Sequence, residues 1–292
     1  MADTLAILQA ALADSYRVER ELGQGGMAQV FLAHDLRHDR TVALKVLRPE
    51  MATSLGAERF LREVRIAAQL RHPHILPLLD SGTAAGGGFS LPFYTMPVAA
   101  GTTLRTLIDA GPVEPAEAVA LVQQAAQALA YAHRAGVVHR DIKPDNVFVE
   151  DGQAVVADFG IARAMSAAGA DRLTATGVSI GTPAYMSPEQ LIGDAELDGR
   201  ADQYSLACVL VELLTGLPPY PARSIHASLA RRLSEVPRYA EEPPPSMSPA
   251  VAAALDRALA PTPADRFPDT QAFADALGAP AAPPLPRSRS GR

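Results

Sequence analysis

The chain has 292 residues, of which 48% are apolar and 20% charged, enough for one large domain or two lobes around a buried core. Its formal net charge of −6 argues against general nucleic-acid binding, so nucleic acid is not an expected partner. Cys208 is the only cysteine, which excludes an intrachain disulfide. Because it lies in the apolar run 206–211, we interpret it as a small core residue rather than a reactive thiol.

The termini differ in composition from the rest of the chain. Residues 278–292 are dense in Pro, Ala, Ser and Arg, which predicts a disordered tail or linker. Residues 1–15 form an N-terminal extension in which Leu5, Leu8 and Leu12 recur at helical spacing, so a short helix is predicted over 3–14. We expect neither a signal peptide nor a membrane span. These features fit a cytoplasmic protein, or the cytoplasmic part of a longer membrane-anchored one.

The predicted elements change character along the chain. The first part predicts strands at 16–24, 28–34 and 41–47, a helix at about 55–70, and strands at 75–79 and 89–96. After Gly101, helices are predicted at 114–134, 201–215, 225–233, 249–259 and 270–277, with short strands flanking Asp158. A β-rich first third before a helical remainder predicts two unlike lobes in an α+β fold.

A glycine-rich segment, Gly-Gln-Gly-Gly-Met-Ala-Gln-Val at 23–30, lies between the first two predicted strands. Glycines let the backbone approach phosphate oxygens and point N–H groups at them, although hairpins that bind nothing show the same pattern. Lys45 ends the third strand. A lysine there is otherwise an ordinary surface residue, and the preceding glycines make it a candidate phosphate ligand.

The stretch 139–146, His-Arg-Asp-Ile-Lys-Pro-Asp-Asn, places a base, a cation and a metal ligand in one short loop. Asp141 is the candidate base, because an ionised carboxylate can accept or orient the proton of a hydroxyl. Lys143 can stabilise charge that develops on a transferring phosphoryl group. Asn146 offers an amide oxygen to Mg²⁺, which prefers oxygen ligands. Asp158, before Phe159 and Gly160, is the second candidate metal ligand, although an aspartate beside a glycine often marks only a turn.

Together these segments resemble bacterial serine/threonine protein kinases of the eukaryotic-like type, over about residues 16–277. The position of Lys143, two residues after Asp141, is typical of the serine/threonine branch. The resemblance implies a bilobal kinase domain at 16–277. Its small β-rich N-lobe, at about 16–98, carries one regulatory helix, and its larger, mainly helical C-lobe covers about 99–277. ATP with Mg²⁺, or with Mn²⁺ in its place, would bind between the lobes.

The resemblance also implies a nucleotide site. Lys45 would bind the α- and β-phosphates and be held by Glu63 on the following helix, where Glu58 is the competing candidate. Met96 would close the back of the adenine pocket. The implied ATP-binding residues are Leu22, Gly23, Gln24, Gly25, Gly26, Met27, Ala28, Gln29, Val30, Ala43, Lys45, Met96 and Ala99, with Ala28 standing where kinases usually have a third glycine.

Residues 181–189 resemble the end of a kinase activation segment, with Ser187 in place of the usual alanine. The resemblance also implies roles for several regulatory and structural residues. Glu189 would pair with Arg266, Asp202 would brace the catalytic-loop backbone, Phe159 would pack inward, and Thr182 would serve the substrate platform. Arg140 suggests control by phosphorylation at Thr174 or Thr176, which are otherwise ordinary polar loop residues.

The resemblance implies transfer of the ATP γ-phosphoryl group to Ser/Thr hydroxyls of protein substrates, with activation by activation-loop autophosphorylation. A pseudokinase scaffold that only binds ATP is one alternative, but it predicts the loss of Lys45, Asp141, Asn146 or Asp158, and all four are present. A kinase of a small molecule is another, but such enzymes typically lack Lys143 and the 181–189 segment. The resemblance also implies that two copies can pair through the small lobe, but no feature of this sequence argues for such a homodimer.

Overall fold

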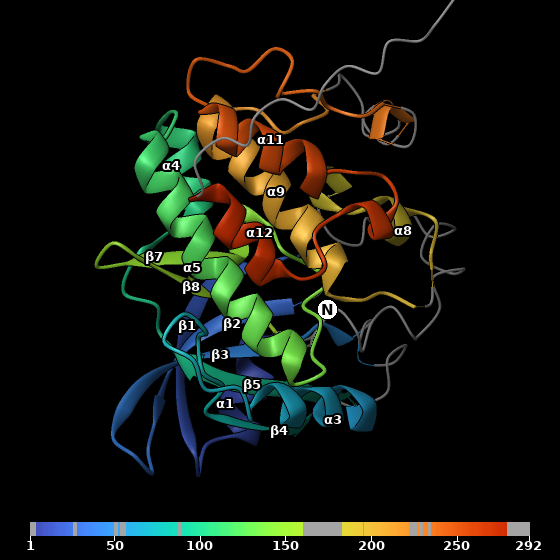
Figure 1. The fold of residues 1–292 in the computed structure, drawn as a ribbon. Helices are drawn as coiled ribbons and strands as arrows, with labels where there is room; N and C mark the ends of the chain where they lie inside the picture. The colour runs from blue at the N-terminus through green and yellow to red at the C-terminus, as the bar shows by residue number, and fades with distance from the viewer. Residues whose placement is uncertain are drawn as a thin grey trace, which may run out of the picture.

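The computed structural model describes residues 4–25, 28–49, 52, 57–86, 89–159, 183–194, 196–221, 227, 230–232 and 235–278. The first part is an antiparallel five-stranded sheet in the order β1-β2-β3-β5-β4. Its strands are β1 (Tyr16–Gln24), β2 (Ala28–Asp35), β3 (Arg40–Leu47), β4 (Asp80–Gly86) and β5 (Phe89–Pro97). The remainder is mainly helical, so the predicted α+β fold with two unlike lobes is confirmed (Figure 1).

Strand β3 is buried on both faces of this sheet. Val42, Leu44 and Val46 join the cluster that contains Leu8 of helix α1 (Thr4–Ala11). Ala43 and Leu47 join the opposite cluster, with Phe60 and Val64 of helix α3 (Ala57–Ala67). Since successive side chains of a strand point to opposite faces, Lys45 shares the α3 face with Ala43 and Leu47. The two helices therefore sandwich the sheet, and Lys45 lies on the face that α3 covers.

Helix α9 (Gly199–Thr215) forms the centre of the helical lobe, and every residue from 201 to 214 is buried. Helices α4 (Leu104–Ala110), α5 (Pro115–Arg134), α11 (Pro249–Ala258) and α12 (Thr270–Leu277) contact it from different sides (Figure 1). A helix that is buried around its whole circumference needs such a surround. Asp202 lies in the first turn of this helix and is part of the buried stretch.

A small antiparallel sheet carries the segments that lead to the site. It consists of β6 (Thr102–Thr103), β7 (Val147–Glu150) and β8 (Gln153–Val156). Val156 also forms a parallel bridge with Ile75, in the segment that follows α3. Gly101 makes the approach to this sheet possible, because a Cβ there would lie 1.8 Å from the carbonyl oxygen of Val149.

Most predicted elements agree with the structure within a few residues, and α12 agrees at both ends. The strand predicted at 75–79 is wrong, because that segment makes only the bridge at Ile75, and the strand begins at Asp80 instead. Both strands near Asp158 precede it, and the residues after 159 lie outside the described ones. The predicted helix at 225–233 also falls largely outside them. Within the described residues, no helix is both long and apolar enough to cross a bilayer.

Candidate active site

The catalytic loop connects the end of α5 to β7 and places two polar side chains against one carboxylate. Lys143 Nζ lies 2.8 Å from Asp141 Oδ2, and Asn146 Nδ2 donates to the same oxygen at 3.1 Å and to the Asp141 carbonyl at 2.8 Å. The Asp141 side chain is 35% exposed, so an incoming hydroxyl can reach it. Both bonds of Asn146 use its amide nitrogen, which leaves the amide oxygen as the atom suited to a cation.

Asp202, in the first turn of α9, holds the backbone of this loop. Its Oδ2 accepts from the His139 amide and its Oδ1 from the Arg140 amide, both at 2.7 Å. His133 Nε2 lies 2.8 Å from Oδ2. A Cβ on Gly199 would lie 2.4 Å from His133 Nδ1, so only glycine lets α9 approach this ring. Burial alone would raise the pKa of the Asp202 carboxyl, but His133 and the amide donors outweigh it and hold that pKa below its ordinary value.

Two non-glycine residues of the site have left-handed backbones. Arg140 and Asp158 both have φ of 67°. This conformation costs free energy in residues with a Cβ, and it persists only where surrounding contacts impose it. Asp202 supplies such a contact to Arg140. For Asp158 the contacts come from Lys45 and from Tyr94 of β5.

Lys45 and Tyr94 each hold one oxygen of the Asp158 carboxylate. Lys45 Nζ lies 2.6 Å from Oδ2, and the Tyr94 hydroxyl donates to Oδ1 at 2.7 Å. Burial alone would raise the pKa of the Asp158 carboxyl, but the Lys45 charge and these hydrogen bonds bring it below its ordinary value. Tyr94 is buried, and burial together with the Asp158 charge raises the pKa of its phenol.

The expected ion pair between Lys45 and Glu63 is not the one the structure forms. Glu63 is on α3 and buried, but the carboxylate that Lys45 contacts belongs to Asp158. The ion pair recorded for Glu63 among the described residues is a long one of 3.9 Å with Arg62. The physical reason is that Lys45 lies within a buried strand and needs a nearby carboxylate, and Asp158 supplies it directly. Glu58, the competing candidate, is exposed.

The described members of the predicted nucleotide site line one end of the sheet. Gly23 and Gln24 end β1 and pair with Val30 and Gln29 of β2. Ala43 pairs with Met96 across β3 and β5, and both are buried. Leu22 and Gly25 are exposed, Ala28 is buried, and Ala99 is half-buried just beyond β5. Gly26 and Met27 lie outside the described residues.

The oxygen atoms of this site suit a divalent cation. Asp158 provides a carboxylate and Asn146 an amide oxygen. In the part of the chain that the structure describes, no group of three or more His, Cys, Asp or Glu residues could hold a metal by itself. Carboxylate and amide oxygens are the ligands that a hard divalent cation prefers.

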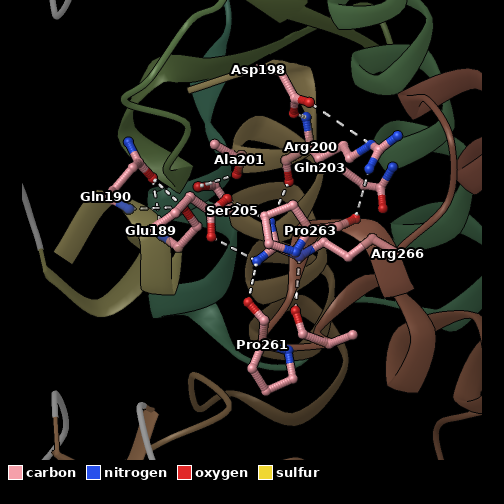
Figure 2. A network of polar contacts seen from close by, with 12 residues as sticks. Glu189, Gln190, Asp198, Arg200, Ala201, Gln203, Ser205, Pro261, Pro263 and Arg266 are labelled. Carbon is pink, nitrogen blue, oxygen red and sulfur yellow. Dashed lines mark hydrogen bonds and ion pairs between the residues drawn. The ribbon is translucent and has the colours of Figure 1, made fainter. Parts of the chain in front are cut away.

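A buried ion pair anchors residues 183–191, called the platform from here on, beside the catalytic loop. Arg266 donates to the two carboxylate oxygens of Glu189 at 2.7 and 2.8 Å, and it also donates to three backbone carbonyls, those of Arg200, Ala260 and Pro261. Figure 2 shows this arginine inserted between α8 (Pro188–Leu191), α9 and the segment before α12. Ser187 caps α8.

Other parts of the prediction have a mixed outcome. Phe159 is buried and packs edge-on against the His139 ring, with 4.8 Å between the ring centroids. Thr174, Thr176 and Thr182 lie outside the described residues, so their predicted roles stay predictions.

Three sets of side-chain contacts near the site were not predicted from the sequence. Tyr94 resembles any core aromatic, because its partner Asp158 is 64 residues away. Gln190 donates to the Arg140 carbonyl. Arg105 of α4 and Tyr185 both contact Glu212 of α9, forming a buried polar group beneath the platform. Glu212 could have been found, since it is the one charged residue in an otherwise apolar stretch of α9.

Comparison with known proteins agrees with this geometry. The family model described as "Protein kinase domain" matches residues 16–277. The chain is 43% identical over 256 residues to serine/threonine-protein kinase PknD of Mycobacterium tuberculosis, which covers 86% of this chain and 37% of that protein. It is 41% identical over 259 residues to PknB of Mycolicibacterium smegmatis, with 88% and 41% covered. The chain thus spans about two fifths of the length of these relatives.

A solved structure shows the same fold. The crystal structure of the M. tuberculosis PknI kinase domain superimposes with a TM-score of 0.71 at 33% identity, covering 90% of this chain and 94% of that one. The family model covers most of the chain, and the relatives exceed 40% identity over nearly the same region. The chain therefore belongs to the protein kinase family.

Proposed function

We propose that this domain transfers the γ-phosphoryl group of ATP to serine or threonine hydroxyls of proteins. Protein kinases use ATP with a divalent metal and act on protein substrates. The observation that carries the proposal is the exposed Asp141 carboxylate, which Lys143 and Asn146 contact while Asp202 fixes the loop backbone. A base with a cation and a cation ligand beside it is the arrangement that phosphoryl transfer requires.

In this mechanism Asp141 orients the substrate hydroxyl and accepts its proton. A bond forms between that hydroxyl oxygen and the γ-phosphorus, and the bond from the γ-phosphorus to the bridging oxygen of ADP breaks. Lys143 stabilises the charge on the transferring group. Asn146 and Asp158 would hold a divalent cation, and their hard oxygen atoms favour Mg²⁺ with Mn²⁺ as a substitute; that cation would neutralise phosphate charge.

Lys45 has a second task in the proposal. Its ammonium contacts Asp158, and Lys45 pairs with Val30 of β2, which ends the glycine-rich segment. When ATP is bound, Lys45 would contact its α- and β-phosphates while it stays close to Asp158. Glu63 is buried on the same face of the sheet, and we propose that it supports Lys45 only after α3 and the sheet adjust around the nucleotide.

The test is a phosphotransfer assay with radiolabelled ATP, Mg²⁺ and a generic basic protein, with Asp141→Asn as the matched control. We expect incorporation on serine and threonine that the variant lowers by roughly a hundredfold or more. A wild-type protein that binds ATP but transfers no phosphate would contradict the proposal and favour the pseudokinase scaffold. Labelling of small hydroxyl compounds instead of proteins would favour a small-molecule kinase.

We propose, in addition, control by autophosphorylation at Thr174 or Thr176, with the added phosphate paired to Arg140. A phosphate carries a charge of about −1.5 to −2 at neutral pH and pairs well with a guanidinium. Mass spectrometry after incubation with ATP should find phosphate on one of these threonines. Replacement of both by alanine should lower the activity, and unchanged activity would refute this regulation.

A further inference from the structure

The amide side chain of Gln190 connects the platform to the catalytic loop. Gln190 follows Glu189 on α8 (Figure 2). Its Oε1 accepts from the Ser187 backbone amide at 3.0 Å, and its Nε2 donates to the Arg140 carbonyl at 2.8 Å. The first contact belongs to the capping box of α8, in which the Ser187 hydroxyl in turn accepts from the backbone N–H of Gln190. One end of the amide is thus fixed by α8 and the other reaches 50 residues back along the chain.

The Arg140 carbonyl is part of the peptide unit that precedes the base. Its oxygen is held by Gln190, and the N–H of the same unit, which belongs to Asp141, donates to His139 Nδ1 at 3.2 Å. His139 Nε2 in turn contacts the Ala157 carbonyl at 2.8 Å, so its two ring nitrogens have different partners. The plane of this peptide unit is therefore held from both sides.

The backbone conformation of Arg140 explains why this peptide unit has to be held. The contacts of Gln190 and His139 with it are called the clamp from here on. With φ of 67°, Arg140 occupies a left-handed conformation that a residue with a Cβ leaves unless it is held. Asp202 holds the Arg140 amide, on one side of its Cα. Among the contacts that the structure records for this residue's backbone, Gln190 holds the carbonyl, on the other side. Rotation of that peptide unit would swing the Asp141 side chain away from Lys143 and Asn146.

We propose that Gln190 is a positioning residue, which sets the orientation of the peptide unit before Asp141 and makes that orientation depend on the folded platform. The proposal rests on the phosphoryl-transfer function proposed above. Because the acceptor end of Gln190 is part of the α8 cap, loss of α8 releases the donor end as well. Ordering of the platform and alignment of the base thus become one event.

Two variants separate this role from general stability. Gln190→Glu keeps an oxygen for the Ser187 amide but cannot donate to the Arg140 carbonyl at neutral pH. Gln190→Met removes both contacts and adds no charge, so a fall shared by both variants is due to the lost donor. The matched control is Gln123→Glu, because Gln123 Nε2 also donates to a backbone carbonyl, that of Ala274, at 3.0 Å and far from the loop.

We expect both Gln190 variants to lower kcat roughly tenfold to a hundredfold, as small displacements of catalytic groups do, while the KM for ATP stays within about twofold. Gln123→Glu should leave kcat near that of the wild type, even if its thermal midpoint falls. Equal kcat values for the Gln190 variants and the Gln123 control would overturn the proposal. So would a kcat loss that disappears at a lower assay temperature, since that loss would reflect unfolding alone.

A second measurement does not depend on activity. Hydrogen exchange of the 139–146 segment in the nucleotide-free protein should be faster in both Gln190 variants than in the wild type, and unchanged in Gln123→Glu. Unchanged exchange in the Gln190 variants would refute the clamp even if the protein were inactive. Comparison of the wild type with Asp141→Asn tests the proposed function separately, so the two failures can be told apart.

Discussion

Arg266 holds both carboxylate oxygens of Glu189, 77 residues away in the sequence, through two parallel hydrogen bonds inside the helical lobe. Neither side chain is appreciably exposed, so each charge depends on the other to offset the cost of leaving water. The remaining donors of the guanidinium are used by backbone carbonyls around it. This pair therefore fixes the platform to the base of the lobe.

Removal of either partner should destabilise the protein strongly. Glu189→Gln and Arg266→Met each leave a buried charge without its partner, which typically costs about 3–5 kcal/mol. Arg266→Lys should also be destabilising, because an ammonium cannot make two parallel bonds to a carboxylate and still reach the carbonyls. Urea unfolding followed by circular dichroism would measure the shift of the midpoint.

The matched control is the exposed pair of Arg231 and Glu235, whose side chains lie 2.8 Å apart. Arg231→Lys changes the same residue type where water screens the charges, and no resolvable shift is expected. An Arg266→Lys midpoint equal to that of Arg231→Lys would show that the buried pair contributes nothing to stability.

Loss of the Tyr94 hydroxyl should weaken metal use more than it weakens the fold. Tyr94→Phe keeps the ring packed against Phe60 but removes the hydroxyl that donates to Asp158 Oδ1, while Lys45 stays on Oδ2. A hydrogen bond to a charged group contributes about 1.5–3 kcal/mol. We expect the free Mg²⁺ concentration at half-maximal activity to rise several-fold, because Asp158 is then held by Lys45 alone.

Titration of Mn²⁺ by water proton relaxation in the presence of ATP would measure the same change without turnover. Tyr131→Phe is the control, since the Tyr131 hydroxyl accepts from the Arg71 amide away from the site. Metal dependence that is the same in the two variants, or tighter in Tyr94→Phe, would contradict the positioning of Asp158 by Tyr94.

How far the sequence predicts this molecule depends on the range of the determining contacts. Strands β1 to β3 and helix α12 follow from local patterns and turn residues, and the catalytic loop follows from fixed spacing. Strand β4, Asp-Ser-Gly-Thr-Ala-Ala-Gly, has little intrinsic strand preference and forms because β5 pairs with it. Tertiary pairing overrode propensity there.

The partner of Lys45 is a second feature that depends on contacts between distant parts of the chain. The resemblance singled out Glu63, which is buried on α3, but the sequence does not determine how far α3 lies from the sheet. That distance decides whether Lys45 reaches Glu63 or Asp158, and it depends on packing across the whole lobe. The contacts of Tyr94 and Gln190 are of the same kind, since their partners are 64 and 50 residues away.

Cys208 should be unreactive in the folded protein. It is fully buried in α9, and this burial raises the pKa of its thiol to about 11 against the opposing charges of Arg232 and Arg266. The thiolate is the reactive form, so at pH 8 little of it exists and no reagent reaches it. Iodoacetamide should modify one thiol per chain in urea and essentially none without it. Rapid labelling of the native protein would contradict the interpretation of Cys208 as a core residue.

Acid should remove the stabilisation that Asp202 provides. The folded-state pKa of this carboxyl lies below its ordinary value, so its contribution is present above the unfolded pKa of about 3.9 and is lost as the pH falls through the folded value. Asparagine has only one side-chain oxygen, so Asp202→Asn cannot accept from both the His139 and the Arg140 amide as the carboxylate does. The variant should therefore be less stable than the wild type at pH 7. The difference in urea midpoint should stay constant down to about pH 5 and shrink below about pH 4, because the unfolded wild-type carboxyl then takes up its proton while the folded one stays ionised to lower pH. A difference that persists unchanged to pH 3 would mean that the Asp202 charge does not stabilise the catalytic loop.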